Sequence, residues 1–271
     1  MRPLSSQDIL NRQTPVDEKS WDADETELPV GSIRLERFQQ LEQILRNNPV
    51  NPSPYLELSR IYLADQRWND AKRVLDRAVE QFPEEEEILH LREDAQLARS
   101  LKLVQEAEKE YQAEPTILTQ EAIARAKVEL NAVREKVCRA RLARSPEQVE
   151  LLIPLGSALR ELGKFDEAIE TLSQATQESE LRADAALQLG NLYAQQRKIP
   201  AALAEYRRAA LFRVPSPAPE IQQKALRAAA DLAERYKLID SARRYVNMLL
   251  MIDPNDQAMQ QKAAALRDQP L

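Results

Sequence analysis

The sequence predicts an all-α protein whose helices form a solenoid of helix-turn-helix repeats. Two segments repeat each other at a spacing of 34 residues, so that Leu155-Gly156 returns as Leu189-Gly190. Only four of the 271 residues are glycine, aromatic residues make up 5% of the chain and charged residues 30%, a composition that suits helical arrays. A fixed period of this length indicates units that bury their apolar faces only against their neighbours.

The segment that starts at Val149 has small and large residues at fixed places. They are Leu152, Leu155, Gly156, Leu159, Gly163, Phe165, Ala168 and Ala175. This set resembles the tetratricopeptide repeat (TPR), in which small residues let helices approach closely and larger residues fill the space beside them. This copy covers 149–182, and the copy after it covers 183–216.

Two further copies fit the same pattern in matching phase. Residues 52–85 have its apolar and small residues at Tyr55, Leu58, Tyr62, Trp68, Ala71, Leu75 and Ala78. A fourth copy over 223–255 has Leu226, Ala229, Ala230, Ala242 and Val246, but it lacks the turn glycine. Four copies in one phase favour a TPR-type helical solenoid over unrelated amphipathic helices.

The N-terminal segment differs in composition from the repeats. Residues 1–31 are expected to be a disordered acidic arm. The segment from Asp17 to Glu27 contains many acidic residues and only one basic residue, Lys19, and the arm can bury little apolar surface. A docking motif around Trp21 is the alternative to a solubilising tail. Residues 32–49 follow with apolar residues at helical spacing, which predicts a capping half-repeat helix.

Residues 86–148 depart from the 34-residue period, with one clear break near Pro115. The second half carries a heptad stripe of apolar residues, namely Ile123, Ala126, Leu130, Val133, Val137 and Ala140. Two interpretations follow: a long antiparallel hairpin with helices of ~27 residues, about 40 Å long, or two degenerate repeats with slightly long helices. The stripe could also pair between chains as a coiled coil and make a homo-oligomer. Residues 256–271 are expected to form a C-terminal capping helix.

Composition argues against catalysis, cofactors and metal ions. His90 is the only histidine and Cys138 the only cysteine, so nucleophile–base pairs and nitrogen–sulfur metal sites are not readily built. Four glycines leave no phosphate-binding loop. No segment approaches the ~20 apolar residues that span a membrane, and the N-terminus lacks the apolar stretch of a signal peptide. These features predict a non-enzymatic cytoplasmic protein.

The resemblance to the TPR family implies a concave groove lined by the first helix of each repeat. Carried over to this sequence, the groove positions are Leu56, Arg60 and Leu63 in the first copy, Ile153, Ser157 and Arg160 in the second, Leu187, Asn191 and Gln195 in the third, and Lys224, Arg227, Asp231 and Arg235 in the fourth. An apolar floor with a basic end would suit an extended peptide or a helix with an acidic end. Asn191 offers both a donor and an acceptor to a peptide main chain. The alternative is that these residues are merely solvated.

The family's clamp for chaperone tails is not matched, since Ile153 and Ser157 stand where it needs Lys and Asn. The predicted function is a protein-interaction scaffold or adaptor. A self-assembling structural protein is the first alternative. A helical-repeat nucleic-acid binder is opposed by the net charge of −6 and the pI of about 5.2.

Overall fold

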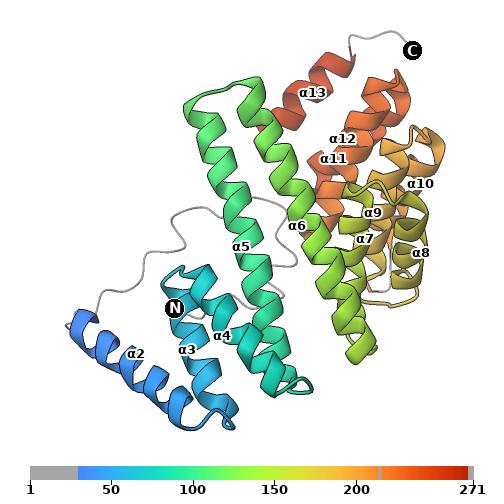
Figure 1. The fold of residues 1–271 in the computed structure, drawn as a ribbon. Coiled ribbons are helices and arrows are strands. Elements are labelled where there is room, and N and C mark those ends of the chain that lie inside the picture. Colours follow the sequence, from blue (N-terminus) through green and yellow to red (C-terminus); the bar gives the residue numbers. More distant parts are fainter. Residues whose placement is uncertain (1–29, 213–214, 268–271) are drawn as a thin grey trace. The chain divides into compact units, whose positions relative to one another are not determined.

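The computed structural model describes residues 30–212 and 215–267, and in these ranges all regular elements are helices (Figure 1). The predicted all-α TPR-type fold is confirmed. The acidic arm predicted for 1–31 lies almost entirely outside the described residues. None of the described helices is both long and apolar enough to cross a membrane. The chain divides into two compact units, Met1–Val137 and Cys138–Leu271, with the boundary inside a long helix.

The first unit begins with α2 (Val30–Asn47), α3 (Pro52–Ala64) and α4 (Trp68–Gln81). Asn51 caps α3 by accepting a hydrogen bond from the backbone N–H of Ser53 at 3.0 Å, and Pro52 occupies the first turn, where its missing N–H costs nothing. The core of these helices is apolar, and its fully buried residues include Leu41, Leu58 and Ala71.

Residues 86–144 form two helices of 28 residues each, α5 (Glu86–Ala113) and α6 (Ile117–Arg144). They are antiparallel (Figure 1). The Nζ atom of Lys127 lies 2.8 Å from Oε1 of Glu108, which links the first part of α6 to α5. Leu130 and Val137 of the heptad stripe are buried in this single chain, so these stripe residues face inward.

The second unit contains three helix pairs. They are α7 (Leu152–Glu161) with α8 (Phe165–Ala175), α9 (Arg182–Gln195) with α10 (Ile199–Leu211), and α11 (Pro219–Arg235) with α12 (Ile239–Ile252). A short 3-10 turn, η2 (Val149–Leu151), precedes α7, and α13 (Gln257–Arg267) follows α12. The first helices of the pairs are neighbours, because α9 contacts both α7 and α11.

The turn inside each helix pair has the same geometry in all four copies. Gly163 adopts a φ of +76°, and three residues at the equivalent place are also left-handed although none is glycine: Gln66 (+56°), Arg197 (+59°) and Lys237 (+57°). The residue after each donates its N–H to a carbonyl five residues back, for example Lys164 to Leu159 at 2.9 Å. This is the Schellman ending of a helix. The missing glycine of the fourth copy therefore leaves the turn unchanged.

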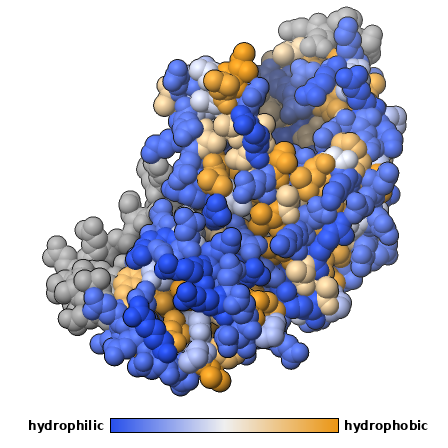
Figure 2. Space-filling model, in the orientation of Figure 1, coloured by the Kyte–Doolittle hydropathy of each residue, from blue (hydrophilic) through white to orange (hydrophobic). Residues whose placement is uncertain are grey.

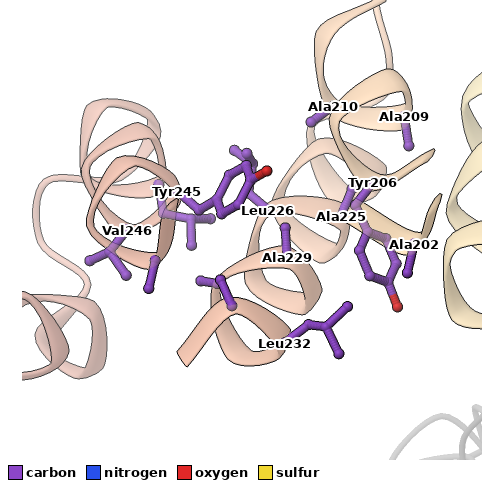
Figure 3. Close-up of a cluster of buried hydrophobic side chains, with 14 of the residues drawn as sticks. Ala202, Tyr206, Ala209, Ala210, Ala225, Leu226, Ala229, Leu232, Tyr245 and Val246 are labelled. Carbon is purple, nitrogen blue, oxygen red and sulfur yellow. The ribbon is translucent and has the colours of Figure 1, made fainter. Parts of the chain in front are cut away.

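Small residues bring the paired helices together. A Cβ placed on Gly156 would lie 2.5 Å from the Leu172 side chain, and one placed on Gly190 would lie 2.5 Å from the Tyr206 ring. Between α10 and α11, Ala202, Tyr206 and Ala225 share one apolar cluster (Figure 3). The 34-residue recurrence of Gly and Ala is thus a packing requirement.

Candidate functional site

The predicted groove residues are distributed over two units. Ten of the thirteen lie in the second unit on α7, α9 and α11, which we call the candidate face: Ile153, Ser157, Arg160, Leu187, Asn191, Gln195, Lys224, Arg227, Asp231 and Arg235. The other three, Leu56, Arg60 and Leu63, lie on α3 in the first unit, where Arg60 pairs with Glu87.

Three of the four apolar groove residues are part of the protein's interior, and the fourth, Leu63, is half-buried. Leu56, Ile153 and Leu187 are all buried, and Leu187 belongs to the large apolar cluster of the second unit. Their side chains therefore stabilise the repeats and leave little surface for a ligand. The accessible part of the candidate face is polar.

A hydrogen-bonded network joins α7 to α9 on this face. Arg160 donates from Nη1 to Oε1 of Gln188 at 3.1 Å, and the Ser157 hydroxyl approaches the same oxygen at 3.3 Å. Gln188 in turn donates from Nε2 to Asp184 at 3.4 Å. Burial raises the pKa of the Asp184 carboxyl, while the positive charge of Lys224 on α11 opposes that shift. Hydrogen bonds thus join α7 to α9, and α11 contributes the positive charge of Lys224.

Asn191 of α9 forms a hydrogen bond with the second helix of its own repeat, α10. The Tyr206 hydroxyl of α10 donates to Oδ1 of Asn191 at 2.9 Å. Burial raises the pKa of Tyr206 to about 12, although Arg160 and Arg235 lower it in part. The hydroxyl therefore stays protonated and holds the Asn191 amide in place. The Nδ2 group of Asn191 has no hydrogen-bond partner among the described residues, so its two donors remain available.

The basic end of the face is smaller than the sequence suggested. Arg227 pairs with Asp256, which precedes α13, and Asp231 pairs with Lys262 of α13. Lys262 also lies 2.7 Å from Glu234. Three charged residues of α11, Arg227, Asp231 and Glu234, are therefore paired with Asp256 or Lys262. Lys224 and Arg235 are exposed, and neither forms an ion pair within the described part of the chain.

Sequence reasoning missed Gln188, Asp184 and Tyr206. A usable signal existed, because polar contacts between successive first helices join residues about one repeat apart. Arg160 and Gln188 are separated by 28 residues, Arg227 and Asp256 by 29, and Asp231 and Lys262 by 31. A search for complementary polar residues at these offsets would have found the network.

Metal chemistry has no evident place in the described residues, since no group of three or more His, Cys, Asp or Glu side chains there is arranged to hold an ion. His90 lies 3.6 Å from Glu86 on α5. Cys138 is buried and forms no disulfide.

The repeats place the chain in a class of helical solenoid proteins that bind other proteins. Residues 38–95 and 153–218 match the tetratricopeptide repeat family. The chain is a TPR protein. None of the curated proteins compared with it matches.

Several solved structures are similar in fold. The TPR protein YrrB, whose structure is described as having an unusual peptide-binding site, is 16% identical; the match covers 83% of this chain and 97% of YrrB, with a TM-score of 0.49. TTC0263, a thermophilic TPR protein of Thermus thermophilus, is 21% identical, with 80% and 99% covered and a TM-score of 0.40. The Naa15/Naa10 complex with HypK-THB contains a chain that is 16% identical, with 86% of this chain and 36% of that chain covered and a TM-score of 0.41.

Proposed function

We propose that this protein is a non-catalytic scaffold or adaptor whose candidate face binds a peptide or helix of a partner protein that has an acidic segment. The TPR fold is generally that of protein-interaction modules. The observation that carries the proposal is Asn191. Its carbonyl is held by the buried Tyr206 hydroxyl, and its two amide donors are left for a ligand.

Charge on the face supports an acidic partner. Arg160 and Arg235, which belong to different repeats, both lower the pKa of Tyr206, whose hydroxyl donates to Asn191. Lys224 adds a third cation on α11. Arg160 already pairs with Glu161 at 2.6 Å, whereas Arg235 and Lys224 form no ion pair within the described ranges. Carboxylates of a bound segment would form charge-assisted hydrogen bonds with Arg235 and Lys224, which are stronger than neutral ones. The overall net charge of −6 gives no comparable support to nucleic-acid binding.

The sharpest variant is Asn191→Asp. It keeps an oxygen that accepts from Tyr206, so the fold is retained, but it removes both amide donors and adds a negative charge beside the site. We expect a partner captured by the wild-type chain from native extract to bind the purified variant on the order of tenfold more weakly or worse, because a charge-assisted hydrogen bond contributes about 1.5–3 kcal/mol.

The matched controls change charge elsewhere. Arg244→Glu alters an exposed arginine on α12, the second helix of its pair, and is expected to leave affinity unchanged, while Arg235→Glu weakens it. Arg227 is unsuitable as a test because its loss would also release Asp256 next to α13. Equal affinity of wild type, Asn191→Asp and Arg235→Glu would refute binding at the candidate face.

Self-assembly through the heptad stripe has less support. Leu130 and Val137 are buried within one chain, so those side chains are not available to a second copy.

A further inference from the structure

The end of the α5–α6 hairpin exposes a group of large apolar side chains. We call residues 110–118 the hairpin tip. Ile117 is 76% exposed, its neighbour Leu118 is 72% exposed, and Tyr111 at the end of α5 is 36% exposed. Figure 2 shows hydrophobic surface at this end of the hairpin. Single exposed apolar residues are ordinary on protein surfaces, but a contiguous group is typical of interaction sites.

Hydrogen bonds fix the local conformation of the tip. The N–H of Thr119 donates to Oγ1 of Thr116 at 3.2 Å, and the N–H of Thr116 approaches Oγ1 of Thr119 at 3.0 Å. The Thr119 hydroxyl also lies 2.9 Å from the carbonyl oxygen of Glu114. This reciprocal capping holds Ile117 and Leu118 in the first turn of α6. Binding through them would therefore require little further ordering of the backbone.

The tip is distant from the repeat that supports the hairpin. In the first unit, α5 joins the apolar core of α3 and α4 through Ile88 and Leu91, and Arg92 pairs with Asp76 at 2.8 Å. Glu114 lies 22 residues beyond Arg92. At 1.5 Å per residue, the helix places the tip about 33 Å from this contact. The hairpin is therefore long enough to present the tip well away from the repeat that α3 and α4 form.

The charge around the tip selects the kind of partner. Between 106 and 127 the chain carries five glutamates and three basic residues. Two of the basic residues already form ion pairs, Arg125 with Glu121 and Lys127 with Glu108. The other charges of this region form no ion pair with any described residue, and they are Glu106, Lys109, Glu110 and Glu114. An excess of negative charge disfavours an anionic membrane surface and an identical acidic tip.

We propose that the hairpin tip is a second docking site, which inserts Ile117 and Leu118 into an apolar pocket of a partner protein rimmed by Lys or Arg. Binding interfaces combine an aromatic or aliphatic anchor in a pocket with a polar rim, and complementary charge adds specificity. The hairpin tip lies in the first unit and shares no residue with the candidate face, so the two proposed sites can be tested separately.

The test uses the full-length chain with a photo-crosslinking amino acid at position 117. In native extract we expect one cross-linked product with another protein, which is then purified for titration. Leu118→Ser and Glu110→Lys/Glu114→Lys should each weaken its binding at least tenfold at low salt, and the effect of the charge reversal should shrink at high salt. Met251→Ser removes an equally exposed apolar residue and is expected to have no effect.

Several outcomes would overturn this proposal. They are the absence of a cross-linked protein, a product of two copies of this chain, sedimentation with anionic vesicles that depends on Leu118, or a partner that binds the charge-reversed variant as tightly as the wild type. Asn191→Asp should leave cross-linking at position 117 unchanged. Failure of the groove proposal and failure of the tip proposal are therefore distinguishable.

Discussion

In the pair α9–α10, the backbone of Gly190 faces the ring of Tyr206, and α9 is also in contact with α7, α8 and α11. In the hairpin, the far end of α5 and α6 carries Ile117 and Leu118 in solvent. The two regions have different packing constraints. A repeat helix is enclosed by neighbours, so its contact positions must be small. Ile117 and Leu118 at the hairpin end are more than 70% exposed among the described residues, so close packing does not restrict their size.

In each repeat, the sizes of the two residues that face each other across the helix pair are complementary. Where α9 has Gly190, α10 has the large Tyr206, and where α11 has Ala230, α12 has the smaller Val246. The first repeat has Ser59 with Leu75 at these places, both fully buried. Close packing requires that the volumes of facing residues compensate. Enlarging one residue of a facing pair should therefore destabilise the fold.

Gly190→Ala is expected to destabilise the protein most, by roughly 3 kcal/mol. Its Cβ would lie 2.5 and 2.6 Å from two carbon atoms of the Tyr206 ring, which is buried and tied to Asn191. The clash outweighs the gain of about 1 kcal/mol that Ala brings to a helix. Urea unfolding measures the difference. Gly156→Ala should cost less, because the Leu172 side chain can rotate away more easily than a ring.

A second variant separates overpacking from other causes. Tyr206→Leu gives the third repeat the residue that Leu172 provides in the second, and it should recover part of the stability lost in Gly190→Ala. If Gly190→Ala alone proved neutral, the close packing inferred between α9 and α10 would be wrong.

Tyr206 should also make the repeats sensitive to alkaline pH. Its folded pKa is about 12 because of burial, whereas an unfolded tyrosine has a pKa of about 10. Between these values the unfolded chain releases the proton first, so the free energy of unfolding falls as the pH rises, by about 2–3 kcal/mol across the window. Below pH 10 this contribution is fully present. Urea midpoints measured between pH 9 and 12 should show a shallower decline in Tyr206→Phe than in wild type; parallel curves would contradict the assignment.

The left-handed turn residues offer a smaller, stabilising effect. Arg197 and Lys237 adopt φ values of +59° and +57°, a conformation that costs an L-residue about 1–2 kcal/mol. Arg197→Gly and Lys237→Gly should each stabilise the protein by about 0.5–1 kcal/mol, because the strain relieved exceeds the entropy that glycine adds to the unfolded chain. Thermal unfolding tests this, with Arg197→Ala as the control that removes the side chain but keeps the strain. If Arg197→Gly were no more stable than Arg197→Ala, the left-handed conformation would not be a source of strain at this turn.

The sequence predicted the fold well because packing imposes it directly. Gly156 and Gly190 recur at the repeat spacing since no larger residue fits, and periodicity alone detects them. The turns were predicted only where Gly163 marks one. At Gln66, Arg197 and Lys237 the Schellman hydrogen bonds and helix packing impose the left-handed conformation on ordinary residues.

The candidate site was less accessible to sequence reasoning. Family positions gave Asn191, but its partner Tyr206 lies 15 residues away on the next helix, at a position that the repeat pattern assigns only to packing. Arg227 was taken for a groove cation because its partner Asp256 lies in another element. Burial and charge pairing depend on which helices become neighbours, and a single repeat does not contain that information.

The smallest expected change concerns the hairpin tip. Ile117→Ser and Leu118→Ser remove apolar side chains that are more than 70% exposed, so each should alter the free energy of unfolding by no more than about 0.5 kcal/mol. Leu226→Ala, which removes a fully buried leucine of the second unit, should cost about 2–5 kcal/mol in the same urea assay. On our proposal, Ile117 and Leu118 of this capped turn serve binding and do not support the fold. If Leu118→Ser proved as costly as Leu226→Ala, Leu118 would be a packing residue, and the hairpin would share the constraints of the repeats.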